Sequence, residues 1–190
     1  MWGRYIYMNL ILILICITYS KPQSKTNWNT DTTFYYYTID ANAENLIRKR
    51  INFEKNFDKK EILDSIASYL TNTYFLPKNK YYVGKRKISI NVQKMTAINL
   101  SDNTIFIATV NIDDPDKICL GVYFQGSTGG HNTFLMLVAN LMQPQLAIPL
   151  LDGIIFLYND EEMRSLDHIN LEGLISEREI NDLVRKSIKY

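Results

Sequence analysis

Two segments with alternating apolar and polar residues, separated by a short polar turn, constrain the fold of this chain most strongly. They are KISINV at 87–92, continued by MTAINL, and TIFIATVNI at 104–112. Successive side chains of a strand point to opposite faces, so this period of two predicts strands with one buried face. The buried positions are Ile88, Ile90, Val92, Phe106, Ala108, Val110 and Ile112. The turn SDN at 101–103 is short, which favours antiparallel pairing.

A helix is predicted from Asp58 onward. Asp58 and Glu61 have the spacing of a capping box, in which each side chain bonds a backbone N–H at the start of the helix. Apolar residues follow at helical spacing and form one stripe: Ile62, Leu63, Ile66, Ala67 and Leu70. Pro77 prevents any continuation of this helix. The pattern indicates a helix that packs on the predicted sheet.

Two further helices are predicted downstream. GSTGG at 126–130 reads as a flexible loop, and HNTFLMLVANLMQ at 131–143 as a helix capped by Asn132 or Thr133. In the third helix, Ser176 and Glu179 repeat the capping-box spacing. Its apolar residues line one face that we expect to pack on the domain or on a partner: Ile180, Leu183, Val184 and Ile188.

The remaining apolar segments read as strands and complete an α+β fold. They are FYYYTID at 34–40, ICLGVYF at 118–124 and GIIFLYNDEE at 153–162, the last one ending in a turn. We therefore expect a small mixed or antiparallel sheet with two helices packed on one face, plus a C-terminal helix. The predicted domain spans residues 34–162, and a C-terminal helical tail spans 163–190.

The N-terminal segment predicts export. Residues 1–20 contain one charge, Arg4, followed by the apolar run LILILICI, Leu10–Ile17. This run has the length of a signal-peptide core and is shorter than a full membrane span of about 20 residues. Cleavage after Ser20, lipidation of Cys16 and an uncleaved anchor all stay open. Residues 21–33 are polar and read as a tether between the membrane and the domain.

Composition and charge exclude some functions. The formal net charge is +1, which is too balanced for a nucleic-acid-binding domain. The chain has two cysteines, and loss of the leader with Cys16 leaves Cys119 without an intramolecular partner. A lone cysteine in an apolar run is typically a small buried side chain. No redox or disulfide chemistry is predicted.

The chain offers few residues for catalysis. Its two histidines, His131 and His168, are not arranged as metal ligands, so no metal and no cofactor are predicted. No nucleophile–base pair is recognisable, and the chain is predicted not to be an enzyme. The acidic turn DDPD at 113–116 lacks the spacing of a calcium loop and reads as solvated carboxylates.

One segment can be interpreted as a ligand site. Ser127, Thr128 and His131 lie beside glycines where a helix begins, and backbone N–H groups at such a place can hold an anion. The segment has no lysine, so it is not a Walker-type phosphate loop. The competing interpretation is a loop rich in turn-forming residues.

The order of elements from FYYYTID to FLYNDEE resembles the GerMN domain, a module of spore-germination and other exported bacterial envelope proteins. The correspondence runs through EILDSIASYL, INVQKMTAINLSDNTIFIATVNID, GSTGG, FLMLVANLMQ and IIFLYNDE. The sequence ANL at 139–141 stands where members often have Thr-Leu. Two features depart from the family: the usual L-x-x-G-P is replaced by YLTNTYFLPKN, and the closing Asp-Gly by Asn159-Asp160.

The resemblance implies a compact, non-enzymatic module that is held at the membrane and assembles with itself or with other envelope proteins. It transfers no functional residues, because the shared pattern is a packing pattern. We therefore expect a cell-envelope, extracytoplasmic protein, either a membrane-anchored lipoprotein or a secreted one. The alternative is an extracytoplasmic protein that binds a small ligand or anion through the Gly126–Asn132 loop.

Overall fold

The computed structural model describes residues 33–40, 45–53, 57–75, 84–101 and 103–188. The predicted leader and tether, with Cys16, lie outside these residues except for Thr33. The elements, in chain order, are β1 (Phe34–Ile39), β2 (Leu46–Ile51), α2 (Lys59–Thr73), β3 (Ser89–Asn99), β4 (Thr104–Asp113), α3 (Ile118–Gly121), α4 (Ser127–Met142), β5 (Gly153–Tyr158), β6 (Glu161–Glu162), β7 (Leu174–Ser176) and α5 (Glu177–Ser187). The α+β class is confirmed.

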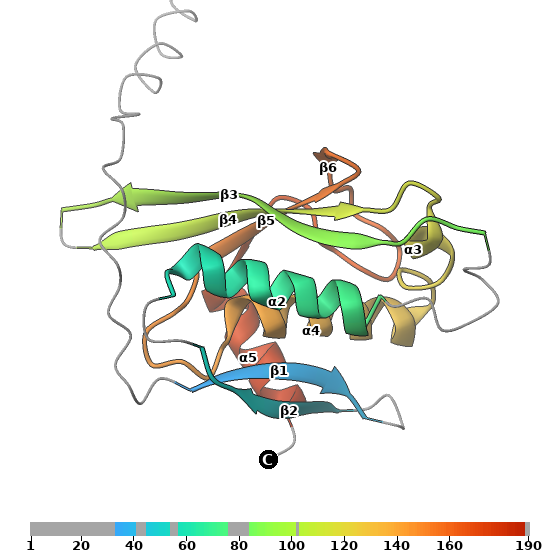
Figure 1. The fold of residues 1–190 in the computed structure, drawn as a ribbon. Coiled ribbons are helices and arrows are strands. Elements are labelled where there is room, and N and C mark those ends of the chain that lie inside the picture. Colours follow the sequence, from blue (N-terminus) through green and yellow to red (C-terminus); the bar gives the residue numbers. More distant parts are fainter. Residues whose placement is uncertain (1–32, 41–44, 54–56, 76–83, 102, 189–190) are drawn as a thin grey trace, which may run out of the picture.

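The strands form two separate sheets. The main sheet has the order β3-β4-β5-β6, with β7 also paired to β5, and β1 and β2 form a second, two-stranded sheet. Strands β3 and β4 are antiparallel as predicted, whereas β4 and β5 are parallel. The chain reaches β5 through α3 and α4, and Figure 1 shows α2 and α4 between the two sheets. The first predicted strand therefore lies across the helices from the main sheet.

The core lies between the main sheet and the two helices. The predicted inward residues of β4, Ala108, Val110 and Ile112, are fully buried. The predicted stripe of α2 is buried too, because it packs against β3. Its capping box is present: Glu61 N donates to Asp58 Oδ1 over 2.8 Å, and Asp58 N donates to Glu61 Oε2 over 2.7 Å. Local sequence thus fixes both the start of α2 and its buried face.

Buried amide side chains of α4 complete the outer edge of β1. Asn140 accepts from the Tyr37 N–H over 3.0 Å and donates to the Tyr37 carbonyl over 3.0 Å. Gln143 makes the same pair of bonds with Tyr35, at 2.9 and 2.8 Å. These two residues replace a neighbouring strand, and so they join the small sheet to the helix layer.

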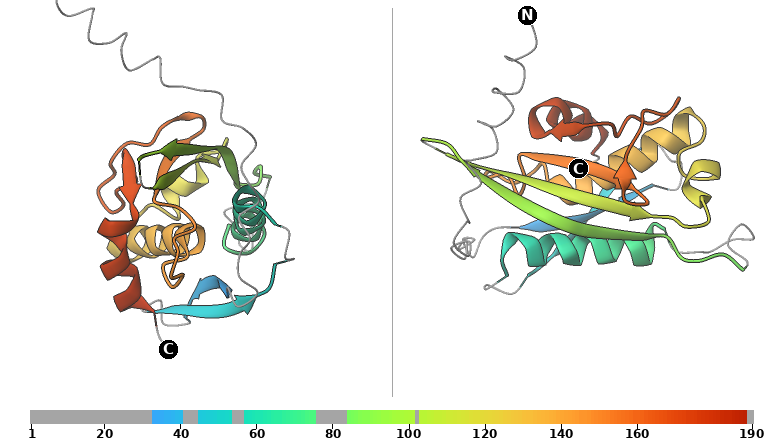
Figure 2. Two further views of the ribbon diagram at one scale, coloured as in Figure 1. Left: turned by 90° about the vertical axis from the view of Figure 1, so that its left-hand side faces the viewer. Right: turned by 90° about the horizontal axis from the view of Figure 1, so that it is seen from above.

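The C-terminal segment packs on the domain. Strand β7 pairs with β5, and α5 contacts α4. A parallel bridge joins Leu46 of β2 to Ile188. Of the predicted apolar stripe of α5, Ile180, Val184 and Ile188 are buried. The left-hand view of Figure 2 shows α5 along one side of the body, next to α4.

The prediction of a strand at 118–124 is wrong. Residues Ile118–Gly121 form the short helix α3 instead. The reason is Asp114, whose carboxylate accepts from the N–H groups of Ile118 over 2.9 Å and Cys119 over 2.6 Å. Asp114 is fully buried, so the interpretation of this acidic turn as wholly solvated is wrong as well.

The prediction of a flexible loop at 126–130 is also wrong. Helix α4 begins at Ser127, with Gly126 as its N-cap, so neither Asn132 nor Thr133 caps it. Gly130 packs directly on the 165–168 segment: a Cβ at this position would lie 2.4 Å from the His168 carbonyl oxygen. This glycine therefore provides a close approach of two backbones.

Candidate interaction surface

The predicted anion-binding residues lie at the surface of the first turn of α4. Ser127, Thr128 and His131 are exposed, and no side chain caps the helix there. The nearby pocket has a volume of about 220 Å³, and other residues line it: Leu120, Phe124, Gln125, Ser165, Leu166, Asp167 and His168. The structure does not enclose Ser127, Thr128 and His131 around a common space, and anion binding stays a prediction.

The buried polar groups near β5 form a structural network. Asp114 accepts from the Tyr158 hydroxyl over 2.8 Å, in addition to its two bonds to α3. Burial, followed by the nearby Asp114 carboxylate, raises the pKa of the Cys119 thiol far above its usual value. A thiol that stays protonated is a poor nucleophile. These groups therefore anchor α3 to the sheet and supply no activated nucleophile.

Lys59 is a buried cation at the start of α2. Its Nζ donates to the carbonyls of Pro149 over 3.0 Å and Leu150 over 2.9 Å, and it lies 4.1 Å from the centre of the Phe106 ring. Burial lowers its pKa to about 8, and Asp152 opposes this shift. These contacts fasten the 144–152 segment to α2.

Within the described ranges, no group of three or more His, Cys, Asp or Glu side chains is placed to hold a metal ion. None of the helices in that part of the chain is long and apolar enough to cross a membrane.

The outer face of the main sheet is the most distinctive surface. The register places Ile98 of β3 opposite Ile105 of β4, and Ile107 opposite Gly153 of β5. Ile155 of β5 likewise faces Leu174 of β7. The outward positions on these four strands include six large apolar side chains and two threonines: Thr96, Ile98, Ile105, Ile107, Thr109, Ile155, Leu157 and Leu174. The register also turns polar residues outward: Ser89, Asn91, Lys94, Asn111, Asp113 and Ser176.

This outer face carries no helix among the described elements. Both α2 and α4 lie on the opposite side of the sheet (Figure 1), and the view from above in Figure 2 looks onto the outer side of β3 and β4. Ile98 is 41% exposed and Leu174 is 51% exposed, and the side chains between them are half-buried. The open face of a half-solvated sheet is usually polar, so a cluster of six large apolar side chains on it is typical of an interface.

The free edge of the main sheet is protected, in contrast to its outer face. At the edge of β3 that pairs with no other described strand, the N–H of Ile90 donates to the Thr71 hydroxyl of α2 over 2.8 Å. A register shift between Val92 and Lys94 interrupts the strand, and Lys94 is exposed. A bulge and an edge lysine oppose strand addition. A partner is therefore more readily accommodated on the face than at this edge.

The sequence contains a signal for this surface. TIFIATVNI has apolar residues at the inward positions and also at two outward ones, Ile105 and Ile107. A strand that is apolar on both faces is buried on both faces in most sheets. The prediction used only the inward alternation, and so it missed the surface.

The site can be compared with known proteins. No family model matches this chain, and the searches of curated proteins and of solved structures found no match either. The resemblance to the GerMN domain therefore stays a prediction.

Proposed function

We propose that this chain is an exported, membrane-associated envelope protein that acts as a non-enzymatic assembly module. Its outer sheet face packs against the same face of a second copy. The observation that carries the proposal is the cluster of six large apolar side chains on the open face formed by β3, β4, β5 and β7. Export and attachment rest on the apolar run Leu10–Ile17, and assembly agrees with the GerMN-like pattern.

A second copy is the occupant that the surface fits best. Two identical patches meet in a two-fold dimer, so the patch must complement itself, and a cluster of apolar side chains on one sheet face can pack against the same cluster of a second copy. Two such sheets pack about 10 Å apart with their strands within about 30° of each other. With the two-fold axis along the strands, Lys94 at the β3 side of one copy lies over the β7 side of the other. Glu172, which is exposed and precedes β7, supplies the opposite charge there.

A matched pair of substitutions tests the proposal. Ile98→Asp places a charge on the outer face, and Ile47→Asp places one on β2, where the isoleucine is 48% exposed against 41% for Ile98. We expect the full chain, in mild detergent, to show concentration-dependent dimers by sedimentation equilibrium. Ile98→Asp should weaken the dimer by at least tenfold, because an unpaired charge would be buried. Ile47→Asp should leave it unchanged.

Charge exchange makes the test specific for a second copy. Lys94→Glu and Glu172→Lys should each weaken the dimer, and the double variant should recover it. A chain that stays monomeric at all concentrations overturns self-assembly. If that monomer is crosslinked in membranes to another envelope protein through the outer face, the partner is that protein.

A further inference from the structure

A basic edge lies on the side of the molecule away from the outer sheet face. Strand β2 has the sequence LIRKRI and pairs only with β1 among the described strands. Lys49 and Arg50 are exposed, and Arg48 is half-buried with its guanidinium 4.8 Å from the centre of the Tyr35 ring. In Figures 1 and 2, β2 forms the outermost layer below the helices.

The end of α5 extends this basic edge. The Leu46–Ile188 bridge brings the last turn of α5 to β2, and Lys186 on that turn is exposed. On the described part of the hairpin the acidic side chain is Asp40, which lies next to the Leu46–Ile188 bridge and accepts a hydrogen bond from Asn45. The whole chain has a net charge of only +1, so this concentration of cations is a local feature.

Protection of an edge strand does not account for all of this pattern. A single lysine suffices to discourage edge-to-edge pairing. The basic edge contains three consecutive cations, and Lys49 shares a face of the hairpin with Ile47, a large apolar side chain that is 48% exposed. Arg48 and Arg50 lie on the other face of the same edge strand. Cations beside an exposed apolar side chain fit the surface of an anionic bilayer, where headgroups meet acyl chains.

We propose that the basic edge of β2, with Lys186, docks on anionic lipid headgroups. The proposal rests on the attachment by the leader that the proposed function includes. Residues 21–33 can span at most about 45 Å at 3.3–3.6 Å per residue, and they lead directly to Phe34 of β1. A leader in the membrane therefore keeps the β1–β2 hairpin near the lipid, and docking leaves the outer sheet face free for a second copy.

Fluorescence of the full chain bound to vesicles tests this docking. An environment-sensitive dye is attached at Thr38→Cys, which pairs with Ile47, and in a second sample at Thr96→Cys on the outer face, both with Cys16→Ser. The vesicles are pure phosphatidylcholine or contain about 30% phosphatidylglycerol. We expect a blue shift at position 38 in the anionic vesicles only, lost in 0.5 M salt, and no such shift at position 96.

Two triple variants with equal changes of net charge provide the control. Arg48→Glu/Lys49→Glu/Arg50→Glu should abolish the shift at position 38. Lys85→Glu/Arg86→Glu/Lys87→Glu should keep it, because that exposed cluster lies before β3 and its Arg86 pairs with Asp116 at 3.7 Å. Equal emission in both vesicle types, or a shift that survives reversal of the β2 charges, overturns the proposal.

Flotation separates this inference from the proposed function. A chain that floats with neutral vesicles is attached by its leader, whatever the dye at position 38 shows. A chain that floats only with anionic vesicles, and loses flotation when the β2 charges are reversed, supports docking and contradicts attachment by the leader. The Ile98→Asp variant should lose the dimer and keep the shift at position 38, because the two surfaces lie on opposite sides of the helices.

Discussion

The two helices under the main sheet are specified in different ways. Helix α2 begins at a capping box and buries one apolar stripe, so its start and its orientation follow from neighbouring residues. Helix α4 begins at Ser127 without a side-chain cap, and every residue from Leu135 to Met142 is buried. It contacts β1, α2 and α5, and this cover on several sides removes the amphipathic pattern. A helix buried on several sides depends on contacts that are distant in sequence.

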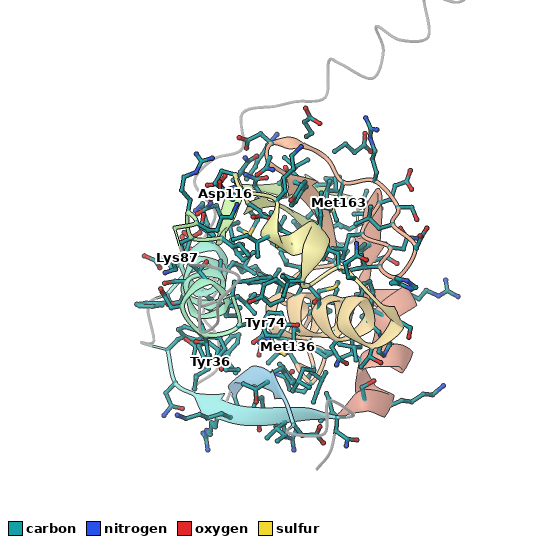
Figure 3. All side chains as sticks on the ribbon, turned by 90° about the vertical axis from the view of Figure 1, so that its right-hand side faces the viewer. Tyr36, Tyr74, Lys87, Asp116, Met136 and Met163 are labelled. Atoms are coloured by element: carbon teal, nitrogen blue, oxygen red, sulfur yellow. The ribbon has the colours of Figure 1, made fainter. Side chains whose placement is uncertain are left out.

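The polar side chains show the same difference. Most of those of α2 make local or exposed contacts, such as the 2.6 Å pair between Lys60 and Asp64 one turn apart. Lys59 and Thr71, near the two ends of α2, bond to segments farther along the chain. In α4, Thr133 donates to the Tyr123 carbonyl over 2.7 Å and is hydrogen-bonded to the Tyr74 hydroxyl at 3.0 Å. Tyr74 lies between α2 and α4 (Figure 3), and burial raises its pKa to about 12. In α4, therefore, polar residues help to hold the layers together.

The largest effect is expected from Asn140→Leu in α4. The substitution leaves the buried N–H and carbonyl of Tyr37 without their partner. Each unsatisfied group costs about 1–3 kcal/mol, so the free energy of unfolding should fall by about 3 kcal/mol, measured by urea denaturation. Asn72→Leu in α2 is the control, because Asn72 is exposed, and it should change stability by less than about 0.5 kcal/mol. Equal losses of stability in Asn140→Leu and Asn72→Leu would contradict the conclusion that α4 depends more than α2 on contacts distant in sequence.

A smaller effect is expected from Gly130→Ala. The added Cβ would meet the His168 carbonyl oxygen at 2.4 Å, and overpacking of this kind costs about 1–3 kcal/mol. Gly129→Ala, one residue earlier, meets nothing closer than 3.8 Å and should stabilise the helix by about 0.5 kcal/mol. If Gly130→Ala lowers the melting temperature and Gly129→Ala raises it, the close backbone approach requires glycine at position 130 and not at position 129. A neutral Gly130→Ala would show that the first turn of α4 is free to move away from residue 168.

Removal of the cap of α2 should cost less. Asp58→Ala deletes the acceptor of the Glu61 N–H, and the loss of such a cap costs about 1 kcal/mol. Ser127→Ala at the start of α4 should have an effect below about 0.5 kcal/mol, since no side chain caps that helix. Chemical denaturation measures both. A larger loss at Ser127 would mean that α4 also has a local start signal.

A pH dependence of stability is expected from Lys59. Its pKa in the folded protein is about 8, below the usual 10.5, so the unfolded chain binds more protons between these values. Stability relative to Lys59→Met should therefore rise with pH from about 8 to about 10.5, and this gain should vanish as the pH falls through 8. The neutral amine still has two N–H donors for the Pro149 and Leu150 carbonyls. Urea denaturation of the unsubstituted chain and of Lys59→Met across this pH range measures the slope, and a difference that does not change with pH would contradict it.

The sequence alone determined the elements that periodicity or short-range hydrogen bonds specify. The α+β class, the β3–β4 pair, the capping box of α2 and the buried stripe of α5 all follow from periodicity and from short-range hydrogen bonds. These features depend on residues a few positions apart. Within one helix or strand, the spacing of such residues in the sequence determines which face they share.

Tertiary structure alone decided the rest. The buried carboxylate of Asp114 converts an expected strand into α3, and the approach of residue 168 explains Gly130. Asn140 bonds with Tyr37 across 103 residues, and no pattern around either residue indicates that pairing. The two candidate surfaces likewise appear only when strands from separate segments stand in register. The physical reason is that burial and strand pairing depend on how the layers assemble. The pattern of adjacent residues indicates only local conformational preferences.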